Sequence, residues 1–157
     1  MPAALPPFFG TELMRASRAY TFAVLTDLAR LTPLIPGLVS SELIDDHTLR
    51  AVVRPSFTFL RATMKLTFTL VETDAPTRIV LHISASGISA GMEIDAELAL
   101  AETNADATEV TWSATVQTLT GLLAHVGPSL IQGAAQQVIR DGWAAVRARI
   151  ENDAAHA

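Results

Sequence analysis

The chain has 157 residues, of which half are hydrophobic and 17% are charged. This length and apolar content predict one folded domain and exclude a disordered protein. The lack of cysteine excludes disulfides, thiolate zinc sites and cysteine nucleophiles. A net charge of −5 without a basic cluster excludes a surface that neutralises nucleic-acid phosphates.

The first ten residues carry no basic residue before an apolar run, so we expect no signal peptide. No stretch reaches the roughly 20 apolar residues that a transmembrane helix needs. The apolar stretch 28–39 is interrupted by Pro33 and Pro36. We therefore expect a cytoplasmic protein without a transmembrane segment, and leave open a peripheral contact with the inner face of the membrane.

The first quarter of the chain predicts one strand and two short helices. Residues 8–14 can form the strand, and Ser17 is suited to cap the helix that follows. Apolar residues recur at helical spacing from Tyr20 to Leu28. Residues 28–35 predict a second short helix, which Pro36 and Gly37 would end.

From residue 38 onward the apolar side chains recur at every second position, which predicts strands. Every connection is short enough for a hairpin, and polar residues alternate with apolar ones along each strand. We therefore predict an antiparallel meander with one solvated face. The predicted strands are residues 38–44, 48–57, 61–72, 78–86, 92–100 and 108–120. The predicted reversals are residues 45–47, 58–60, 74–76, 87–91 and 104–107.

The last segment predicts one long helix that begins at Pro128 and ends near Glu151. Its apolar stripe consists of Leu130, Ile131, Ala134, Ala135, Val138, Ile139, Gly142 and Val146. We therefore predict an α+β fold in which a curved antiparallel sheet of six to seven strands wraps around this helix, with two short helices after the first strand.

A single helix is about 10 Å across, whereas six or seven strands at about 4.8 Å spacing are nearly three times wider. The sheet must curl around the helix or leave apolar surface for a ligand. Ala134, Ala135 and Gly142 are small where a packed core would favour larger side chains. Either they bring the helix close to the sheet or they leave room for a hydrophobic small molecule.

The strand pattern places four large side chains on the concave face, where they either pack the core or form the walls of a pocket. Two residues before Pro36 line an entrance or fix the short helices, and one histidine lies near the start of the long helix. The predicted pocket lining is Leu34, Ile35, Phe68, Leu81, Ile94, Trp112, His125, Leu130, Ile131, Ala134 and Val138.

The polar residues do not predict catalysis. Glu93, Asp95 and Glu97 share the strand face opposite the apolar one, so we expect them in water. His82 should also point outward, and His125 has no visible partner for general-base chemistry. No histidines or acids show metal-ligand spacing on one face, and we predict neither a metal nor a catalytic residue.

Six stretches of the chain follow the pattern of a known family. They are residues 25–27, 34–37, 87–91, 108–112, 121–127 and 130–135. On these stretches the chain resembles the family of the carbon monoxide dehydrogenase G subunit, within the START and Bet v 1-like helix-grip proteins of the SRPBCC superfamily. The resemblance covers residues 9–150, and the run from 121 to 135 is its most specific part.

The resemblance implies a non-enzymatic accessory protein that holds a quinone or lipid-like molecule and serves a molybdenum-containing carbon monoxide dehydrogenase-type enzyme. It implies no metal or covalent cofactor. Two alternatives stay open at this point. One is a recruitment or maturation factor whose cavity is incidental, and the other is an enzyme of the polyketide cyclase or aromatase type. Residues 151–157 are too few and too polar for a membrane anchor.

Overall fold

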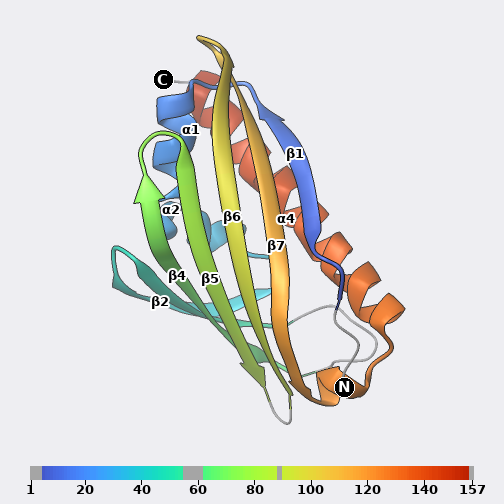
Figure 1. Cartoon of the computed structure of the whole chain (residues 1–157). Coiled ribbons are helices and arrows are strands. Elements are labelled where there is room, and N and C mark those ends of the chain that lie inside the picture. Colours follow the sequence, from blue (N-terminus) through green and yellow to red (C-terminus); the bar gives the residue numbers. More distant parts are fainter. Residues whose placement is uncertain (1–4, 55–61, 88–89, 156–157) are drawn as a thin grey trace.

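The computed structural model describes residues 5–54, 62–87 and 90–155. Within them, seven strands form one antiparallel sheet in the order β1-β7-β6-β5-β4-β3-β2, and the long helix α4 (Pro128–Ala155) crosses one face of that sheet (Figure 1). The predicted α+β architecture is confirmed. The strands are β1 (Phe8–Met14), β2 (Leu38–Asp45), β3 (Thr48–Val53), β4 (Met64–Asp74), β5 (Arg78–Gly87), β6 (Ala90–Asn104) and β7 (Ala107–Gly121).

Two short helices follow β1, as predicted. Ser17 caps α1 (Arg18–Leu25), because its hydroxyl accepts a hydrogen bond from the backbone N–H of Tyr20 at 3.2 Å. The second predicted helix divides into α2 (Leu28–Leu31) and a 3₁₀ turn, η1 (Thr32–Leu34). The division falls at Pro33, whose missing N–H cannot extend an α-helix.

The strand predictions differ from the structure mainly at their ends. The hairpin of β6 and β7 is longer than predicted, and its ladder continues to the pair Asn104 and Ala107. The helix α3 (Leu122–His125), between β7 and α4, was not predicted. The predicted reversal at residues 58–60, the end of the strand 48–57 and the centre of the reversal 87–91 lie outside the described residues.

Two clusters of buried side chains hold the helices to the sheet, and burying each large side chain stabilises the fold by roughly 1.5–3 kcal/mol. The first cluster joins α1, α2 and the end of α4 to the sheet through Met14, Phe22, Val24, Leu25, Leu28, Leu49, Ile79, Val110 and Ile150. The second surrounds the start of α4 and contains Leu5, Val53, Met64, Ala85, Ala90, Leu123 and Ile131. Ile35 is partly buried against both clusters.

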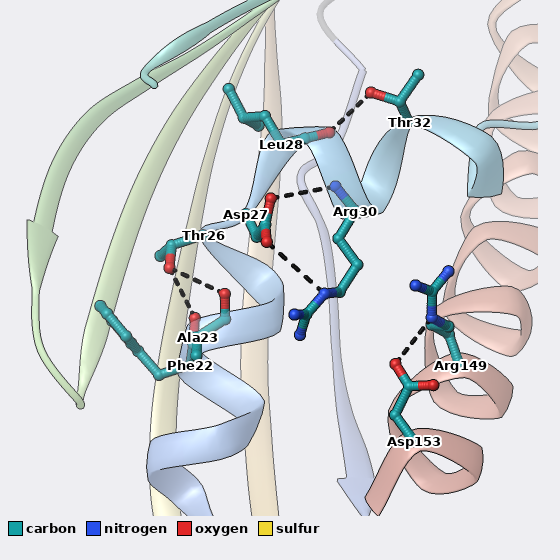
Figure 2. A network of polar contacts seen from close by, with 9 residues as sticks. All are labelled: Phe22, Ala23, Thr26, Asp27, Leu28, Arg30, Thr32, Arg149 and Asp153. Carbon is teal, nitrogen blue, oxygen red and sulfur yellow. Dashed lines mark hydrogen bonds and ion pairs between the residues drawn. The ribbon is translucent and has the colours of Figure 1, made fainter. Parts of the chain in front are cut away.

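Polar contacts orient the short helices and the last turns of α4 (Figure 2). Asp27 caps α2 by accepting from the backbone N–H of Arg30 at 3.1 Å, and the Arg30 side chain turns back so that its Nε lies 3.6 Å from the same carboxylate. On α4, Arg149 donates to Asp153 at 2.8 Å. The Arg149 hydrogen bond is the main reason why the pKa of Asp153 is below its ordinary value, with a smaller contribution from Tyr20.

The outer face of the sheet carries the predicted acidic side chains. Asp95 and Glu97 are exposed there, as expected. The register places His82 of β5 opposite Asp95 of β6, and its Nδ1 lies 2.7 Å from an Asp95 oxygen. Its Nε2 lies 3.1 Å from Glu93, which also accepts from Ser84 at 2.7 Å. These hydrogen bonds, first from Asp95 and then from Glu93, raise the pKa of His82.

This arrangement predicts a pH-dependent contribution of His82 to stability. Because the folded-state pKa is raised above 6.5, the contribution is fully present below that value and is lost as the pH rises through the folded pKa. We expect the free energy of unfolding of wild type to exceed that of His82→Gln by at most about 1 kcal/mol near pH 6, and the difference to shrink by about pH 8.5. Urea unfolding at both pH values measures it. His125→Gln is the control, and an equal His82→Gln difference at both pH values would contradict the assignment.

Candidate functional site

The face of the sheet toward α4 has small side chains at its centre. In the register of β5, β6 and β7, Leu81 lies opposite Ala96, which lies opposite Ala114. Both alanines are only half-buried, although they share the helix-facing side with the two core clusters. The neighbouring rows hold larger side chains: Ile79, Leu98 and Trp112 in one row, and Ile83, Ile94 and Val116 in the other.

The middle of α4 carries Trp143, which packs against Trp112, and beside it Gly142, which has no side chain. Gly142 lies in the apolar stripe between Ile139 and Val146. A Cβ added at Gly142 would meet no heavy atom within 4 Å. At this position the small residue is therefore not required for close contact between helix and sheet, and room for a ligand there stays a prediction.

The predicted lining residues fall into three groups by exposure. Ile131 is buried in the second core cluster. The half-buried ones are Leu34, Ile35, Phe68, Leu81, Ile94, Trp112 and Ala134. The exposed ones are His125, Leu130 at 51% and Val138 at 40%. The structure therefore brings Ile35, Phe68 and Leu81 together against the first cluster. It places Leu130 and Val138 toward solvent, and ligand contact by any of these residues stays a prediction.

A groove of about 420 Å³ lies on the β1 side of α4 and opens to solvent. One wall comes from the N-terminal segment and β1, and the other from the first half of α4, with Trp112 of β7 completing the lining. The lining residues are Pro6, Pro7, Phe8, Phe9, Trp112, Gln132, Gln136, Ile139 and Arg140. Of these, only Trp112 was predicted from the sequence as a pocket residue.

Packing fixes the position of the Trp112 indole. Its ring centroid lies 6.1 Å from that of Trp143 on α4, with the planes tilted by 32°. Gly10 is paired with Trp112, and a Cβ at Gly10 would lie 2.9 Å from Cζ2 of the indole. The indole Nε1 is buried and has no hydrogen-bond partner among the described residues. A buried donor without a partner is costly and uncommon in folded proteins.

The described residues do not assemble an acid–base centre. Of the described polar and charged residues, Thr21 and Thr108 are the buried ones, and neither ionises in the physiological range. The exposed His125 forms no hydrogen bond or ion pair with the described part of the chain. Among the residues searched, no group of three or more His, Cys, Asp or Glu could hold a metal ion.

The sequence places the chain in a known family. The sequence model of CoxG, described as the G subunit of carbon monoxide dehydrogenase, matches residues 10–151. The chain belongs to the CoxG family. The match covers almost all of the sequence and both core clusters except Leu5, so the predicted resemblance is confirmed. A search among curated proteins found no match.

Solved structures extend the likeness to the fold. A conserved protein from Geobacillus kaustophilus superposes with a TM-score of 0.84 at 18% identity, covering 92% of this chain and 95% of that one. A START superfamily protein from Mycobacterium smegmatis gives 0.74 at 11% identity, covering 93% and 97%. An aromatase/cyclase from a Streptomyces species gives 0.71 at 14% identity, covering 94% of both chains. At these identities the likeness concerns the fold alone, and it confirms the START-like helix-grip architecture.

Membership of the CoxG family supports an accessory role at a coarse level. The fold by itself identifies no ligand. No helix in the described part of the chain is both long and apolar enough to cross a membrane.

The contact between Gly10 and Trp112 yields a test of the site's packing. Gly10→Ala should destabilise the fold by about 1–3 kcal/mol, because the indole must move while it is packed against Trp143. Urea unfolding followed by tryptophan fluorescence measures both the stability and the indole environment. The matched control is Gly142→Ala, which meets open space and should gain up to about 1 kcal/mol from helix propensity. Unchanged stability and emission in Gly10→Ala would show that the indole is not held as described.

Proposed function

We propose that this CoxG-family chain is a non-enzymatic accessory protein that holds a quinone or lipid-like molecule between the sheet and α4. We further propose that it serves a molybdenum-containing carbon monoxide dehydrogenase-type enzyme, as the family description suggests. The observation that supports ligand binding most directly is the half-buried pair Ala96 and Ala114 on the helix-facing side of the sheet.

The physical reason is the distribution of large and small side chains. The two core clusters pack the two ends of α4, where Ile131 and Ile150 are buried. Between them, Trp143 packs against Trp112, whereas Ala96, Ala114 and Gly142 contribute little volume. A hydrophobic guest would cover the apolar surface left by these residues, at about 25 cal/mol per Å² removed from water. An apolar lining is the usual property of small-molecule sites.

Filling the region tests this proposal. Ala96→Phe should abolish binding of decylubiquinone while lowering the free energy of unfolding by less than about 1 kcal/mol, because the ring enters available space. Quenching of tryptophan fluorescence measures binding, and urea unfolding measures stability. Ala99→Phe is the matched control, since Ala99 is exposed on the opposite face of the same strand. Two results together would defeat the proposal. The wild type would not bind decylubiquinone, and Ala96→Phe would lower the free energy of unfolding by about 1–3 kcal/mol, as expected if the core is already filled.

The ligand itself can be sought directly. Organic extraction of the protein purified from its native cells, followed by mass spectrometry, should recover an apolar molecule from wild type and not from Ala96→Phe. Recovery of the same molecule from both proteins would place it elsewhere on the chain.

A second candidate function is recruitment of a partner enzyme, and the edge strand β2 favours it. Val39, Leu43 and Ile44 are 57%, 46% and 42% exposed. An edge strand with exposed apolar side chains and one unpaired side can receive a strand from another protein. If β2 recruits the enzyme, Leu43→Asp should abolish its co-purification, whereas Ala96→Phe should not. Unchanged co-purification in Leu43→Asp would remove this role from β2.

A further inference from the structure

The strand β1 forms one edge of the sheet, and the ladder fixes which of its backbone groups face away from β7 (Figure 1). On β6, the N–H of Leu100 points toward β5, where it donates to the carbonyl of Thr77 at 2.8 Å. Leu100 is paired with Val110 of β7, and Val110 with Glu12 of β1. Because such groups alternate in direction along antiparallel strands, Val110 and Glu12 bond to each other. The residues on either side of Glu12 therefore turn their backbone groups toward the open edge.

The open edge of β1 is partly occupied. Arg147 of α4 donates through Nε to the carbonyl of Leu13 at 3.3 Å, which agrees with the direction derived from the ladder. The backbone groups of Phe9 and Thr11 have no hydrogen-bond partner within residues 5–54, 62–87 and 90–155, and both residues are exposed. Unpaired groups on an edge strand can bind a strand from another molecule.

β1 also lacks the features that usually prevent edge pairing, which are charges, prolines and bulges within the strand. It pairs with β7 over seven residues without a register shift. Its one charged residue, Glu12, is paired with Arg147 at 3.0 Å on the helix-facing side. At the other edge, β2 has two register shifts and two acidic residues, Glu42 and Asp45. β1 is therefore the more regular edge for pairing with an identical strand.

We propose that two copies of this chain pair antiparallel through β1, with a two-fold axis at Gly10, so that their sheets join. In this register Phe9 of each copy exchanges two hydrogen bonds with Thr11 of the other, which satisfies all four open backbone groups of each strand. At the axis the two Gly10 residues face each other without side chains. A closed two-fold contact of this kind uses the same surface on both copies.

The groups already occupied on β1 select this register. With the axis at Gly10, Leu13 lies opposite Pro7 of the second copy. Pro7 has no N–H to donate, and the Leu13 carbonyl does not need one because it accepts from Arg147. An axis at Thr11 would require Phe9 to donate to that occupied carbonyl. An axis at Phe9 would set Thr11 against Pro7 and leave the Thr11 carbonyl without a donor.

The exposed side chains of β1 complement each other across the same axis. Phe9 and Leu13 lie on the face away from α4 and are 77% and 51% exposed. The register makes Phe9 of the two copies diagonal neighbours, about 7–8 Å apart between Cα atoms, which aromatic rings can bridge. It also sets Leu13 of each copy against the exposed Pro7 of the other. Dimerisation would thus cover both large apolar side chains of this edge.

The helix-facing side supplies charge complementarity. The register sets Glu12 of the second copy opposite Phe8, which lines the groove between β1 and α4. Arg140 lines the same groove and donates to Gln137 at 2.8 Å, and it forms no ion pair with a described carboxylate. Glu12 of the second copy therefore brings negative charge to a groove whose charged lining residue is positive.

The size of the contact indicates a weak dimer. The segment from Phe9 to Leu13 is about 17 Å long, so strand pairing alone buries less area than a permanent dimer does. The dissociation constant should be on the order of 10–100 μM. The contact is separate from the space proposed for the apolar ligand, which lies against the central strands.

Sedimentation velocity over about 1–500 μM protein tests the dimer. Wild type should change from monomer to dimer, and Phe9→Lys should raise the dissociation constant at least about ten-fold, because it removes the ring and places two cations near the axis. Val39→Lys is the matched control: Val39 is 57% exposed on the other edge strand, and its loss should leave the constant unchanged. Since both side chains are exposed, circular dichroism should show both variants folded.

Three results would overturn the proposal. A wild type that stays monomeric would leave this edge to a strand from a different protein. An unchanged constant in Phe9→Lys would place the contact elsewhere on the chain, and an equal loss in Val39→Lys would place it at β2.

Single cysteines test the register, because the chain has none of its own. Directly opposite residues of a hydrogen-bonded pair have Cα atoms about 5.5 Å apart, within the range of a disulfide, whereas diagonal neighbours are too distant. On oxidation, an equal mixture of Phe9→Cys and Thr11→Cys should therefore form a disulfide between the two variants faster than either variant alone. Faster coupling of Phe9→Cys alone would place the axis at Phe9, and faster coupling of Thr11→Cys alone would place it at Thr11. Either result would overturn the register at Gly10.

Discussion

The structure depends on a disproportion between its two layers. Seven strands present one helix-facing side, and one long helix is available to cover it, assisted by α1 and α2 at one end. A helix about 10 Å wide cannot pack against every strand of such a sheet at once. The chain resolves this by concentrating its large buried side chains into two clusters, one near each end of α4. The region between them is partly exposed and combines the small Ala96 and Ala114 with the packed pair Trp112 and Trp143.

The two faces of the sheet carry different kinds of side chain. The helix-facing side has no buried ionisable group among the described residues, and its central rows are apolar. On the helix-facing side Glu12 pairs with Arg147 of α4, whereas the outer side carries charges that pair across strands, as in the contacts of Arg78 with Glu97 and Glu72. Such exposed pairs contribute little stability and are screened by salt. Their alternation with apolar residues instead fixes which face of each strand is buried.

Local signals in the sequence were sufficient for most of the fold. Ser17 predicts the start of α1 because a cap depends on neighbouring residues only. The alternation of polar and apolar residues predicts strands with one solvated face, because this signal also depends on neighbouring residues only. Pro33 lies inside the predicted helix 28–35, and the structure shows that it splits that helix in two. The long β6–β7 hairpin exceeds its prediction because pairing stabilises residues with weak strand preference, such as Ala101 and Glu102.

The site was less predictable, because it depends on residues far apart in the chain. The groove joins Phe9 to Arg140, and no pattern within either segment indicates that they meet. The contact of His82 with Asp95 likewise needs the register of β5 on β6, which alternation alone leaves undetermined. Trp112 could be placed on the concave face by its period, but its contact with Trp143 and the space left by Gly10 are tertiary features.

The burial pattern of α4 has a mechanical consequence. Its fully enclosed side chains, Ile131 and Ile150, are separated by about 28 Å along the axis at 1.5 Å per residue. The helix is thus anchored near both ends, and between these anchors Trp143 and Val146 are only half-buried. If a guest is held under α4 as proposed, a small bend of the helix between its anchors would admit it while both anchors stay in place. Exchange of a guest would then require neither detachment of the helix nor opening of the sheet.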